Sequence, residues 1–235
     1  YTPSIETKVL SQFINSFFSF IHLCFSDVDK VLILNTANGP FGILTKIFNK
    51  KTCINVDGLE WLRPKWKGFG NFYFKIATKL ATVFFDVIIS DSTEIQKIYK
   101  KKYGKESNVI RYGPSLAKTF KSNYLKEKNI QKEQYYLIVG RLIPDNNVLF
   151  IVNSFLKSKS TKKLVVVGDV PYIDNYSTKV KSIRDERIVF LGYVKDQSIL
   201  NELYQKSLFY IHGHEFGGTN PTMVNALFQG CQILA

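Results

Sequence analysis

The residues best suited to bind an anion follow a short apolar stretch, Tyr135–Val139, that ends in glycine. Gly140 would let the backbone approach a ligand closely, and the planar guanidinium of Arg141 can donate paired hydrogen bonds to a phosphate. Asn146 would lie near the start of the following helix, and helix N-termini favour anions. The pattern therefore predicts a phosphate contact at Arg141, with a salt bridge at a sheet edge as a second interpretation.

Two similar turns follow other apolar stretches. Gly192 and Tyr193 come after residues 187–191, and a glycine in such a turn exposes backbone N–H and C=O groups that can pair with the edge of a base. Gly168 follows Lys163–Val167 and is typical of a purely structural turn as well. We expect base binding at Gly192 because of its place in the series of turns, since the turn alone is an ordinary one.

The stretch 212–227, HGHEFGGTNPTMVNAL, is the most distinctive of the sequence. It combines the end of an apolar run, a glycine-rich turn, and a helix with Asn220 as its N-cap and Pro221 as its first residue. We expect free N–H groups at this helix start to hold a diphosphate. The spacing His-x-His-Glu has no fourth ligand nearby, so a metal site is not predicted, and His212 and His214 are instead candidates for a catalytic base.

The stretch 57–66, DGLEWLRPKW, gathers two carboxylates, an arginine and both tryptophans of the chain. Tryptophan rings stack on sugar rings, while acids and arginine bind hydroxyl or phosphate groups. Glu60, Trp61 and Arg63 are therefore candidates for substrate binding, and Asp57 is a further candidate for the catalytic base. A purely structural role of this stretch is the alternative.

The chain has 235 residues, of which 45% are hydrophobic, and its formal net charge is +13. From Lys97 to Lys132 there are eleven basic residues and two acidic ones, and from Trp61 to Phe85 there are five basic residues and no acid. Such a surface attracts phosphorylated substrates or an anionic membrane, although a solvated lysine face is also an option. Nucleic acid is not expected, because lysine predominates over arginine and no nucleic-acid-binding motif is present.

Cysteine usage and the chain start add two expectations. The three cysteines lie far apart in sequence and are expected to be reduced thiols of a cytoplasmic protein. The chain has neither an initiator methionine nor a signal peptide, so we expect it to begin inside a longer protein. The apolar stretch Phe13–Phe25 is interrupted by polar residues and is shorter than the roughly 20 residues that span a bilayer, which predicts a buried helix.

Short runs rich in β-branched residues alternate with longer amphipathic stretches, as in parallel sheets covered by helices on both faces. Strands are predicted at Lys30–Leu34, Thr52–Val56, Asp86–Ser90, Asn108–Arg111, Tyr135–Val139, Lys163–Val167, Arg187–Leu191, Leu208–His212 and Gln232–Leu234. Helices are predicted at Ser4–Phe25, Phe69–Val83, Ser92–Lys102, Asn146–Ser158, Asp174–Ile183, Asp196–Gln205 and Pro221–Gln229. The stretch 113–134 opens with Gly-Pro and lacks an apolar stripe, so we interpret it as a linker. The expected fold class is α/β, with two Rossmann-like, doubly wound parallel sheets.

The second half of the chain resembles the family-4 glycosyltransferases with the GT-B fold. The C-terminal domain of that family has a strand followed by Gly-Arg-Leu, a Leu-Gly turn at the base, and a glycine-rich loop before a helix. These features occur here as GRL at 140–142, LG at 191–192 and GGTNP at 217–221. The first half, with NVDGLEW at 55–61, is similar to the bacterial rhamnosyltransferase-like branch of capsule and O-antigen biosynthesis.

The resemblance implies two GT-B domains that both look incomplete: 1–113 on the acceptor side and 135–235 for the nucleotide-sugar, with 114–134 as the linker. It implies a retaining hexosyltransferase that needs neither a metal nor a cofactor. The donor would be a UDP- or dTDP-sugar, rhamnose among the options, and the acceptor a lipid-linked saccharide. The enzyme would be cytoplasmic and peripheral on the inner face of the plasma membrane.

Within this resemblance the catalytic residues would be Asp57, Arg141 and His214. The substrate-binding residues would be Glu60, Trp61, Arg63, Asn146, Gly192, Tyr193, Glu215, Gly217, Gly218, Thr219, Asn220 and Asn225. Asn146 and Asn225 stand where the family has lysine and glutamate, so a catalytically degenerate nucleotide-sugar-binding protein is an alternative. A sugar-nucleotide epimerase on the same sheet architecture is another.

Overall fold

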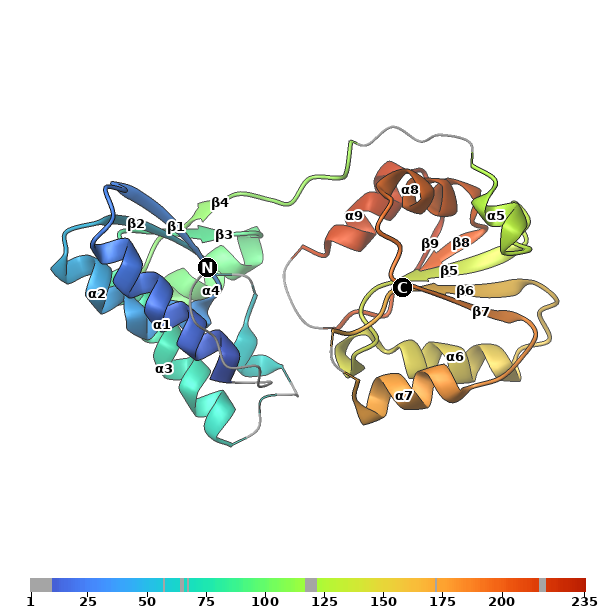
Figure 1. Ribbon diagram of the computed structural model, residues 1–235, viewed down its shortest axis with the longest axis horizontal. Helices are drawn as coiled ribbons and strands as arrows, with labels where there is room; N and C mark the ends of the chain where they lie inside the picture. Colours follow the sequence, from blue (N-terminus) through green and yellow to red (C-terminus); the bar gives the residue numbers. More distant parts are fainter. Residues whose placement is uncertain are drawn as a thin grey trace. The chain divides into compact units, whose positions relative to one another are not determined.

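Two parallel β-sheets, one in each of two units, organise the chain (Figure 1). The computed structural model describes residues 10–56, 58–63, 66, 68–116, 122–171, 173–215 and 219–235. By their contacts, the residues up to Arg111 and Thr219 form the first unit, and residues 112–215 and 220–235 form the second. The predicted α/β class with two parallel sheets is confirmed.

The first unit contains a four-stranded sheet in the order β1-β2-β3-β4, in which every neighbouring pair is parallel. Its strands are β1 (Lys30–Leu34), β2 (Lys51–Asn55), β3 (Val87–Ser90) and β4 (Asn108–Val109). Its helices are α1 (Leu10–Cys24), α2 (Gly42–Ile47), α3 (Phe69–Phe84) and α4 (Thr93–Tyr103), with the 3-10 turns η1 (Thr36–Phe41) and η2 (Glu60–Leu62).

Helices α1, α2 and α3 cover one face of the first sheet (Figure 1). Ile33, Ile54 and Ile88 occupy matching register positions of β1, β2 and β3, and all three are buried. The η1 turn lies directly against α3, since a Cβ on Gly39 would be 1.9 Å from the carbonyl oxygen of Ala77. These contacts make one hydrophobic core for the first unit.

The second unit contains a five-stranded parallel sheet in the order β7-β6-β5-β8-β9. Its strands are β5 (Tyr135–Val139), β6 (Lys163–Val167), β7 (Ile188–Gly192), β8 (Phe209–Ile211) and β9 (Ile233–Leu234). Its helices are α5 (Tyr124–Glu127), α6 (Val148–Lys157), α7 (Asn175–Ser182), α8 (Gln197–Lys206) and α9 (Pro221–Phe228), with the 3-10 turn η3 (Pro144–Asn146).

Helices cover both faces of the second sheet, with α5, α8 and α9 on one side and α6 and α7 on the other (Figure 1). Successive side chains of a strand point to opposite faces, so β5 contributes to two cores. Leu137 packs in the cluster that contains Leu203, and Ile138 packs in the cluster that contains Val152. The near-continuous apolar runs of the sequence reflect this burial on both faces.

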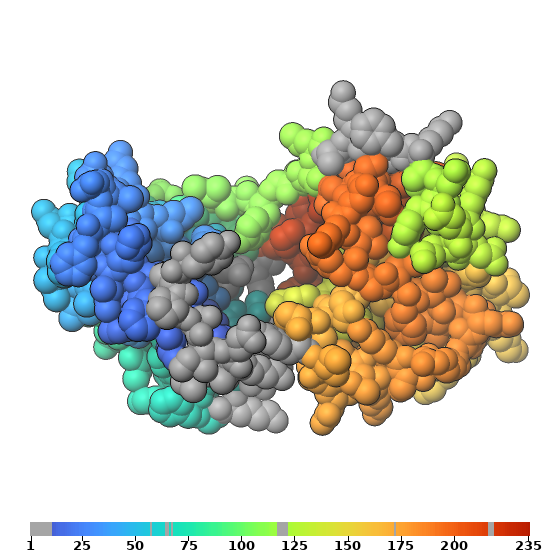
Figure 2. Space-filling view, viewed as in Figure 1, coloured from blue at the N-terminus to red at the C-terminus, as the bar shows by residue number. Residues whose placement is uncertain are grey.

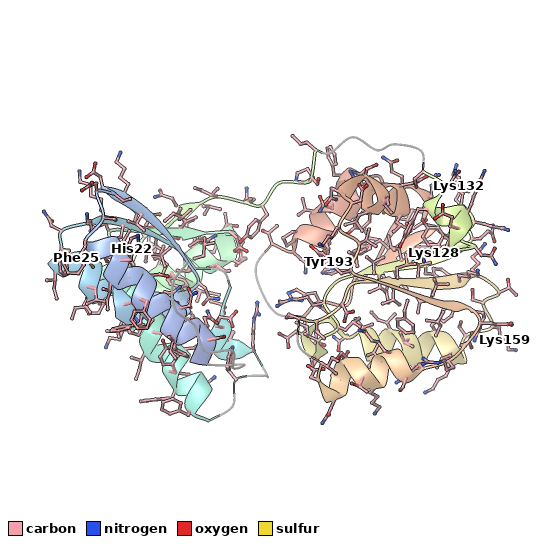
Figure 3. The ribbon with its side chains drawn as sticks, viewed as in Figure 1. His22, Phe25, Lys128, Lys132, Lys159 and Tyr193 are labelled. Carbon is pink, nitrogen blue, oxygen red and sulfur yellow. The ribbon has the colours of Figure 1, made fainter. Side chains whose placement is uncertain are left out.

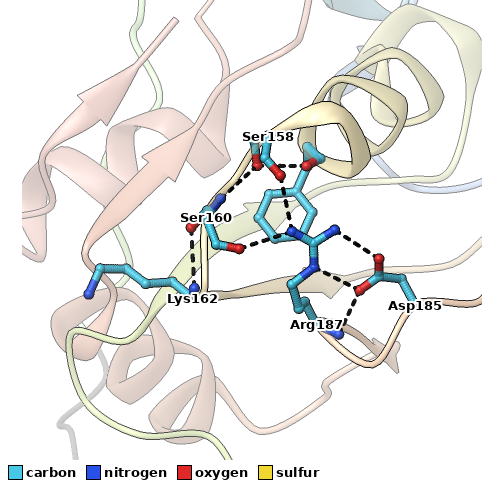
Figure 4. A network of polar contacts seen from close by, with 6 residues as sticks. Ser158, Ser160, Lys162, Asp185 and Arg187 are labelled. Atoms are coloured by element: carbon cyan, nitrogen blue, oxygen red, sulfur yellow. Dashed lines mark hydrogen bonds and ion pairs between the residues drawn. The ribbon is translucent and has the colours of Figure 1, made fainter.

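A polar network closes the end of the second sheet at which β6 and β7 begin (Figure 4). Arg187 forms an ion pair with Asp185 at 2.9 Å and donates hydrogen bonds to the backbone oxygens of Ser158 and Ser160. Its guanidinium also lies 5.0 Å from the centre of the Phe155 ring. The hydrogen bonds from Arg187 lower the pKa of Asp185 to about 2. This arginine is thus fully engaged in structural contacts.

Most of the predicted strands and helices occur within one or two residues of their expected bounds. Two short helices were not expected. Between β1 and β2, the turn η1 contains Gly39 and Pro40 and helix α2 begins at Gly42, which hid the helical pattern. Within the stretch interpreted as a linker, α5 forms, and Leu125 and Ile130 are buried in the core of the second unit. The expected start of α1 at Ser4 lies outside the described residues.

The described residues contain no helix that is both long and apolar enough to cross a bilayer. Helix α1, which the sequence predicts to be buried, covers the sheet with one side only. Phe20 and Cys24 are buried, whereas Phe17 and Phe18 are exposed. The thiol of Cys24, like those of Cys53 and Cys231, forms no disulfide.

Candidate functional site

A cavity of about 390 Å³ opens in the second unit, at the end of the sheet where β5, β6 and β7 terminate. Parallel α/β sheets bind their ligands at this end. The walls come from the residues that follow each strand and from the start of α9, among them Gly140, Arg141, Asn146, Gly168, Asp169, Tyr193, Lys195, His214, Asn220 and Thr222. This cavity is named the β5–β7 pocket below.

The first unit contains cavities of a different kind. One of about 740 Å³ has Lys30, Lys51 and Asp86 in its wall, at the points where β1, β2 and β3 begin. Another, of about 110 Å³, is mainly apolar and lies between α1 and the start of α3. The larger cavity lies at the end of its sheet where the strands begin, and the smaller one, although η1 after β1 borders it, has no charged residue among those that line it. The β5–β7 pocket is therefore the candidate functional site.

Backbone contacts hold the three strand ends of the pocket together. Gly140 donates its N–H to the carbonyl oxygen of Val167 at 3.0 Å, and Gly168 donates its N–H to the carbonyl oxygen of Gly192 at 2.7 Å. Gly168 has a φ of +127°, and a Cβ at this position would lie 2.0 Å from the carbonyl oxygen of Gly140. Only glycine fits there, which is why the turns after β5, β6 and β7 can come together.

Asn146 joins two predicted site residues through its side chain. Its amide nitrogen donates to the backbone oxygen of Arg141 at 2.7 Å, and its amide oxygen lies 2.7 Å from Nδ1 of His214. Because that oxygen can only accept, Nδ1 of neutral His214 carries the proton and Nε2 carries the lone pair. Gly213 allows this close approach, since a Cβ there would be 2.6 Å from the backbone oxygen of Asn146.

His212 directly follows β8 and is part of a partly buried chain of polar groups. The hydroxyl of Tyr210 lies 3.4 Å from Nδ1 of His212 and 2.8 Å from Oγ1 of Thr222 on α9. Burial lowers the pKa of His212, and the neighbouring His214 adds to this effect. Burial also raises the pKa of Tyr210 to about 12. The chain couples β8 to the start of α9, and His212 is not among the residues that line the pocket.

The charged groups of the pocket are mainly cationic. Arg141 and Lys195 are both exposed and line its wall. The carboxylate of Asp169 also lines it, but an ion pair with Lys181 at 2.6 Å neutralises that charge and lowers the pKa of Asp169. Sequence reasoning missed Lys195, although a lysine two residues beyond Tyr193 in the same loop was a signal that could have identified it. The pocket is therefore suited to an anion.

Gly192 and Tyr193 follow β7 as expected. Gly192 has a φ of +65°, and its carbonyl oxygen is bonded to Gly168. The Tyr193 side chain is 74% exposed and lies beside the end of β7 (Figure 3). The structure thus places Tyr193 in the same pocket as Arg141, whereas base recognition by Gly192 and Tyr193 stays a prediction.

The start of α9 differs from the expectation in one respect. Asn220 is the N-cap, but its side-chain oxygen accepts the backbone N–H groups of Thr222 at 3.0 Å and Met223 at 3.4 Å. These N–H groups, which were expected to be free for a diphosphate, are therefore occupied. The positive end of the helix dipole still faces the pocket through Asn220 and Pro221.

Two further predicted residues of the second unit have structural partners. Asn225 on α9 accepts the backbone N–H of Ser115 at 2.6 Å, so its amide oxygen, predicted to bind the donor, holds the incoming chain segment. Glu215 is exposed, and its backbone N–H donates to the carbonyl oxygen of Asp145 at 3.1 Å. Neither residue lines the β5–β7 pocket.

The remaining predictions for the glycine-rich loop fall partly outside the structure. Gly217 and Gly218 lie outside the described residues. Thr219 groups with the first unit, where its backbone N–H donates to the carboxylate of Asp91 at 2.9 Å and its hydroxyl donates to the Asp91 carbonyl oxygen at 3.0 Å. The N–H of Thr219 is thus already bonded within the first unit.

The predicted acceptor-side residues are structural in the described part of the first unit, which corrects the sequence interpretation. Glu60 is 3% exposed, pairs with Arg63 at 3.0 Å and accepts a hydrogen bond from Nε1 of Trp66 at 2.9 Å. Trp61 is 6% exposed and packs against the ring of Tyr99. A sugar cannot stack on a ring that is buried in the core. Asp57 lies outside the described residues.

No three of the histidine, cysteine, aspartate and glutamate side chains gather as metal ligands would, as far as the described residues go. The predictions that catalysis needs no metal and no cofactor stay predictions.

Comparison with known families gives a partial match. A family model described as a domain of unknown function, DUF1972, matches residues 27–115, which is less than half of the chain. No curated protein matches the sequence. The match covers the sheet of the first unit but neither α1 nor the β5–β7 pocket.

Solved structures match nearly the whole chain. Sucrose-phosphate synthase from Thermosynechococcus elongatus has a TM-score of 0.76 at 13% identity, covering 93% of this chain and 58% of that one. HepE from Anabaena, in complex with UDP-glucose, has a TM-score of 0.71 at 17% identity, covering 96% and 64%. UDP-N-acetylglucosamine 2-epimerase from Rickettsia bellii has a TM-score of 0.60 at 15% identity, covering 88% and 57%.

At these identities the likeness concerns the fold. The two parallel sheets, together with the likeness to glycosyltransferases over most of the chain, show that the chain has the GT-B fold. The chain spans between 57% and 64% of the length of these three proteins. Because an epimerase is among them, the fold by itself does not distinguish sugar transfer from epimerisation.

Proposed function

We propose that the β5–β7 pocket binds the diphosphate of a nucleoside-diphosphate sugar and that the chain is the core of a glycosyltransferase. The observation that carries this proposal is that Arg141, Lys195 and the start of α9 border one cavity at the ligand-binding end of a parallel sheet. That HepE, a protein of the same fold, was solved with UDP-glucose supports the same class of donor.

In such a transfer, the bond between the anomeric carbon and the diphosphate oxygen breaks while the acceptor oxygen bonds to that carbon. Negative charge then develops on the leaving diphosphate. The guanidinium of Arg141, the ammonium of Lys195 and the positive end of α9 would stabilise that charge. His214, which Asn146 holds with Nε2 carrying the lone pair, is the candidate to accept the proton of the acceptor hydroxyl.

The finer parts of the proposal rest on the sequence motifs and on charge. The resemblance of GRL at 140–142 and GGTNP at 217–221 supports retaining, metal-independent transfer of a hexose such as rhamnose. The net charge of +13 supports peripheral attachment of the protein to the inner face of an anionic membrane. The acceptor would then be a lipid-linked saccharide of a surface polysaccharide. We expect Gly192 and Tyr193 to lie at the base of a UDP- or dTDP-sugar.

Isothermal titration with UDP, dTDP and uridine tests nucleotide binding directly. We expect one of the diphosphates to bind and uridine to bind far more weakly, because uridine lacks the charge that Arg141 would contact. Arg141→Ala should weaken diphosphate binding about 10- to 100-fold, the effect of losing hydrogen bonds to a charged group. Arg184→Ala removes an exposed arginine of the same unit and is the matched control. Equal affinity for uridine and UDP would contradict the proposal.

Two alternatives differ in what happens to the donor. An epimerase, favoured by the likeness to the Rickettsia bellii enzyme, changes the sugar-nucleotide without any acceptor. A glycosyltransferase instead releases the nucleoside diphosphate only when an acceptor is present. Incubation of the protein with a UDP-sugar alone, followed by chromatography of the sugar-nucleotide, separates the two, since a new epimer appears only in the first case.

A catalytically degenerate nucleotide-sugar-binding protein is the second alternative. The bond between Asn225 and the Ser115 amide favours it, because this side chain is occupied by the chain itself. Such a protein would bind UDP or dTDP with the same dependence on Arg141 but release no nucleoside diphosphate in the presence of a lipid-linked acceptor. An acceptor-dependent release of UDP or dTDP would exclude this alternative.

A further inference from the structure

The outer face of α3 is apolar to a degree that is unusual for a helix in water. The inner face of the helix buries Phe74 and Ala81 in the core of the first unit. The exposed apolar residues of the helix, with exposed fractions from 41% to 82%, are Phe69, Phe72, Ile76 and Val83. A surface helix normally carries polar residues on this side, and contiguous exposed apolar groups usually mark an interaction site.

Lysines are the charged residues of this outer face. Lys75 and Lys79 are exposed and lie on α3 among the exposed apolar residues. No acidic residue occurs from Trp61 to Phe85. Lys102 of α4 adds to the positive charge, because it is close enough to Lys75 for the two ammonium groups to repel each other. The face therefore combines apolar groups with Lys75 and Lys79, neither of which has an ion-pair partner among the described residues.

The surface continues from α3 onto α2. Lys46 of α2 donates a hydrogen bond from Nζ to the backbone oxygen of Val83 at 3.2 Å, so the two helices lie side by side at this point. Ile43 and Ile47 of α2 are 45% and 70% exposed. Residues of both helices reach the surface of the first unit (Figure 2). We name this surface the α2–α3 face; it consists of Ile43, Lys46, Ile47, Phe69, Phe72, Lys75, Ile76, Lys79 and Val83.

We propose that the α2–α3 face docks on the surface of a bilayer that contains anionic phospholipid. Aromatic side chains such as Phe69 and Phe72 enter the boundary between head groups and acyl chains, and lysines such as Lys75 and Lys79 pair with the anionic head groups. The inference rests on the proposed function, since a lipid-linked acceptor resides in such a bilayer. It goes further by naming the surface that meets the membrane.

The charge of the face favours a lipid surface over a second copy of the chain. In a symmetric dimer the same patch meets itself, so Lys75 and Lys79 of both copies would be brought together without any acid to compensate them. An anionic bilayer supplies the opposite charge over the whole area. Stable attachment to a bilayer takes two signals, and this face carries both an apolar and an electrostatic one.

Flotation of the 235-residue chain with vesicles is the direct test. We expect the protein to float with vesicles of phosphatidylcholine and phosphatidylglycerol and to stay in solution with vesicles of phosphatidylcholine alone. High salt should release it, because salt screens the attraction between lysines and head groups. Absence of flotation with the anionic vesicles would overturn the proposal.

Paired variants locate the docking surface. Phe69→Ser with Phe72→Ser, and separately Lys75→Glu with Lys79→Glu, should each lower the partition onto anionic vesicles about tenfold or more. The apolar control is Phe150→Ser with Ile173→Ser, which removes two exposed apolar side chains of the second unit. The charge control is Lys157→Glu with Lys159→Glu, which changes the net charge equally in the second unit.

The outcomes separate this inference from the proposed function. Equal binding of the α2–α3 variants and the controls would place the membrane contact elsewhere and refute the inference. A dimer in sedimentation that dissociates in the Phe69→Ser/Phe72→Ser variant, without vesicle binding, would show that the face meets a second copy instead. Titration of each variant with UDP and dTDP should match the unmodified chain. If no diphosphate binds but the vesicle results hold, the proposed function fails and the docking surface stands.

Discussion

The two sheets of this protein are built alike, yet polar groups serve different purposes at the ends of their strands. In the second unit, Arg141 and Lys195 are exposed around a cavity of about 390 Å³. In the first unit, Glu60 beyond β2 is 3% exposed and is bonded to Arg63 and Trp66. Sequence reasoning treated Arg141 and Glu60 alike as ligand-binding residues, and their exposure separates them.

The comparison shows that exposure and ion pairing distinguish a charged side chain that stabilises the fold from one that can bind a ligand. A buried charge must be paired within the protein, because desolvation otherwise costs more than the fold can supply. Glu60, which is paired with Arg63, meets this condition. Arg141 forms no such ion pair among the described residues, so its charge is open to an anionic partner.

The largest effect is expected from Gly168→Val. The new side chain would combine a strained positive φ with a clash against the carbonyl oxygen of Gly140, and should lower the free energy of unfolding by about 4 kcal/mol. Urea unfolding measures this loss. Gly192→Ala is the matched control, since a Cβ there meets nothing within 4 Å, and should cost only about 1 kcal/mol for its positive φ. Equal losses would show that the strand ends are not packed as described.

Glu60→Ala should have the next largest effect, and on stability alone. Removing this carboxylate leaves the guanidinium of Arg63 buried without its partner, which should lower the free energy of unfolding by about 3 kcal/mol. UDP or dTDP affinity, measured by titration of the folded protein, should be unchanged. If Glu60→Ala lost nucleotide affinity while its stability stayed unchanged, Glu60 would be a ligand-binding residue and not a structural one.

Lys195→Ala should weaken nucleotide binding without changing stability, the reverse of the effect of Glu60→Ala. Lys195 is exposed and has no ion-pair partner among the described residues, so unfolding in urea should be unchanged. Loss of one charge from the pocket wall should weaken UDP or dTDP binding about fivefold, the effect of roughly 1 kcal/mol. Lys163→Ala, which removes a lysine from the start of β6 at the far end of the strand, is the control. Identical affinities of the two variants would exclude Lys195 from the site.

The smallest effect concerns pH. Burial lowers the pKa of His212 in the folded chain, so below its ordinary value of about 6.5 the unfolded chain takes up a proton more readily. The free energy of unfolding should therefore fall as the pH drops below about 6.5, whereas it is insensitive to His212 above that value. His212→Gln should flatten this dependence in urea unfolding at a series of pH values. An unchanged slope would mean that His212 is not buried as neutral imidazole.

The sequence predicted the parallel sheets and the glycine turns because both are local properties. Runs such as Tyr135–Val139 and Lys163–Val167 are nearly all apolar, and only a strand buried on both faces tolerates that pattern. Gly168 was recognised as a turn but not as the residue that allows β5 and β6 to end side by side. That role depends on the carbonyl oxygen of Gly140, which is 28 positions away in sequence (168 − 140).

Burial was the property that the sequence could not supply. Trp61 and Glu60 have side chains that bind sugars in many proteins, but here Tyr99 of α4 covers the Trp61 ring. Asn146 and His214 were both proposed as site residues, yet their hydrogen bond joins positions in η3 and after β8 and could not be inferred from spacing. Gly192 and Tyr193 were predicted as site residues, whereas Lys195 of the same loop was not.

A nitrogen-15 NMR titration of the chain with UDP and dTDP tests the central claim most directly, because both tryptophans lie in the first unit and report on it separately. We predict that the backbone signals of Gly140, Gly168 and Lys195 shift with the diphosphate, while the indole signals of Trp61 and Trp66 do not. Shifts at the two indoles without any at the turns after β5, β6 and β7 would contradict the assignment of the pocket.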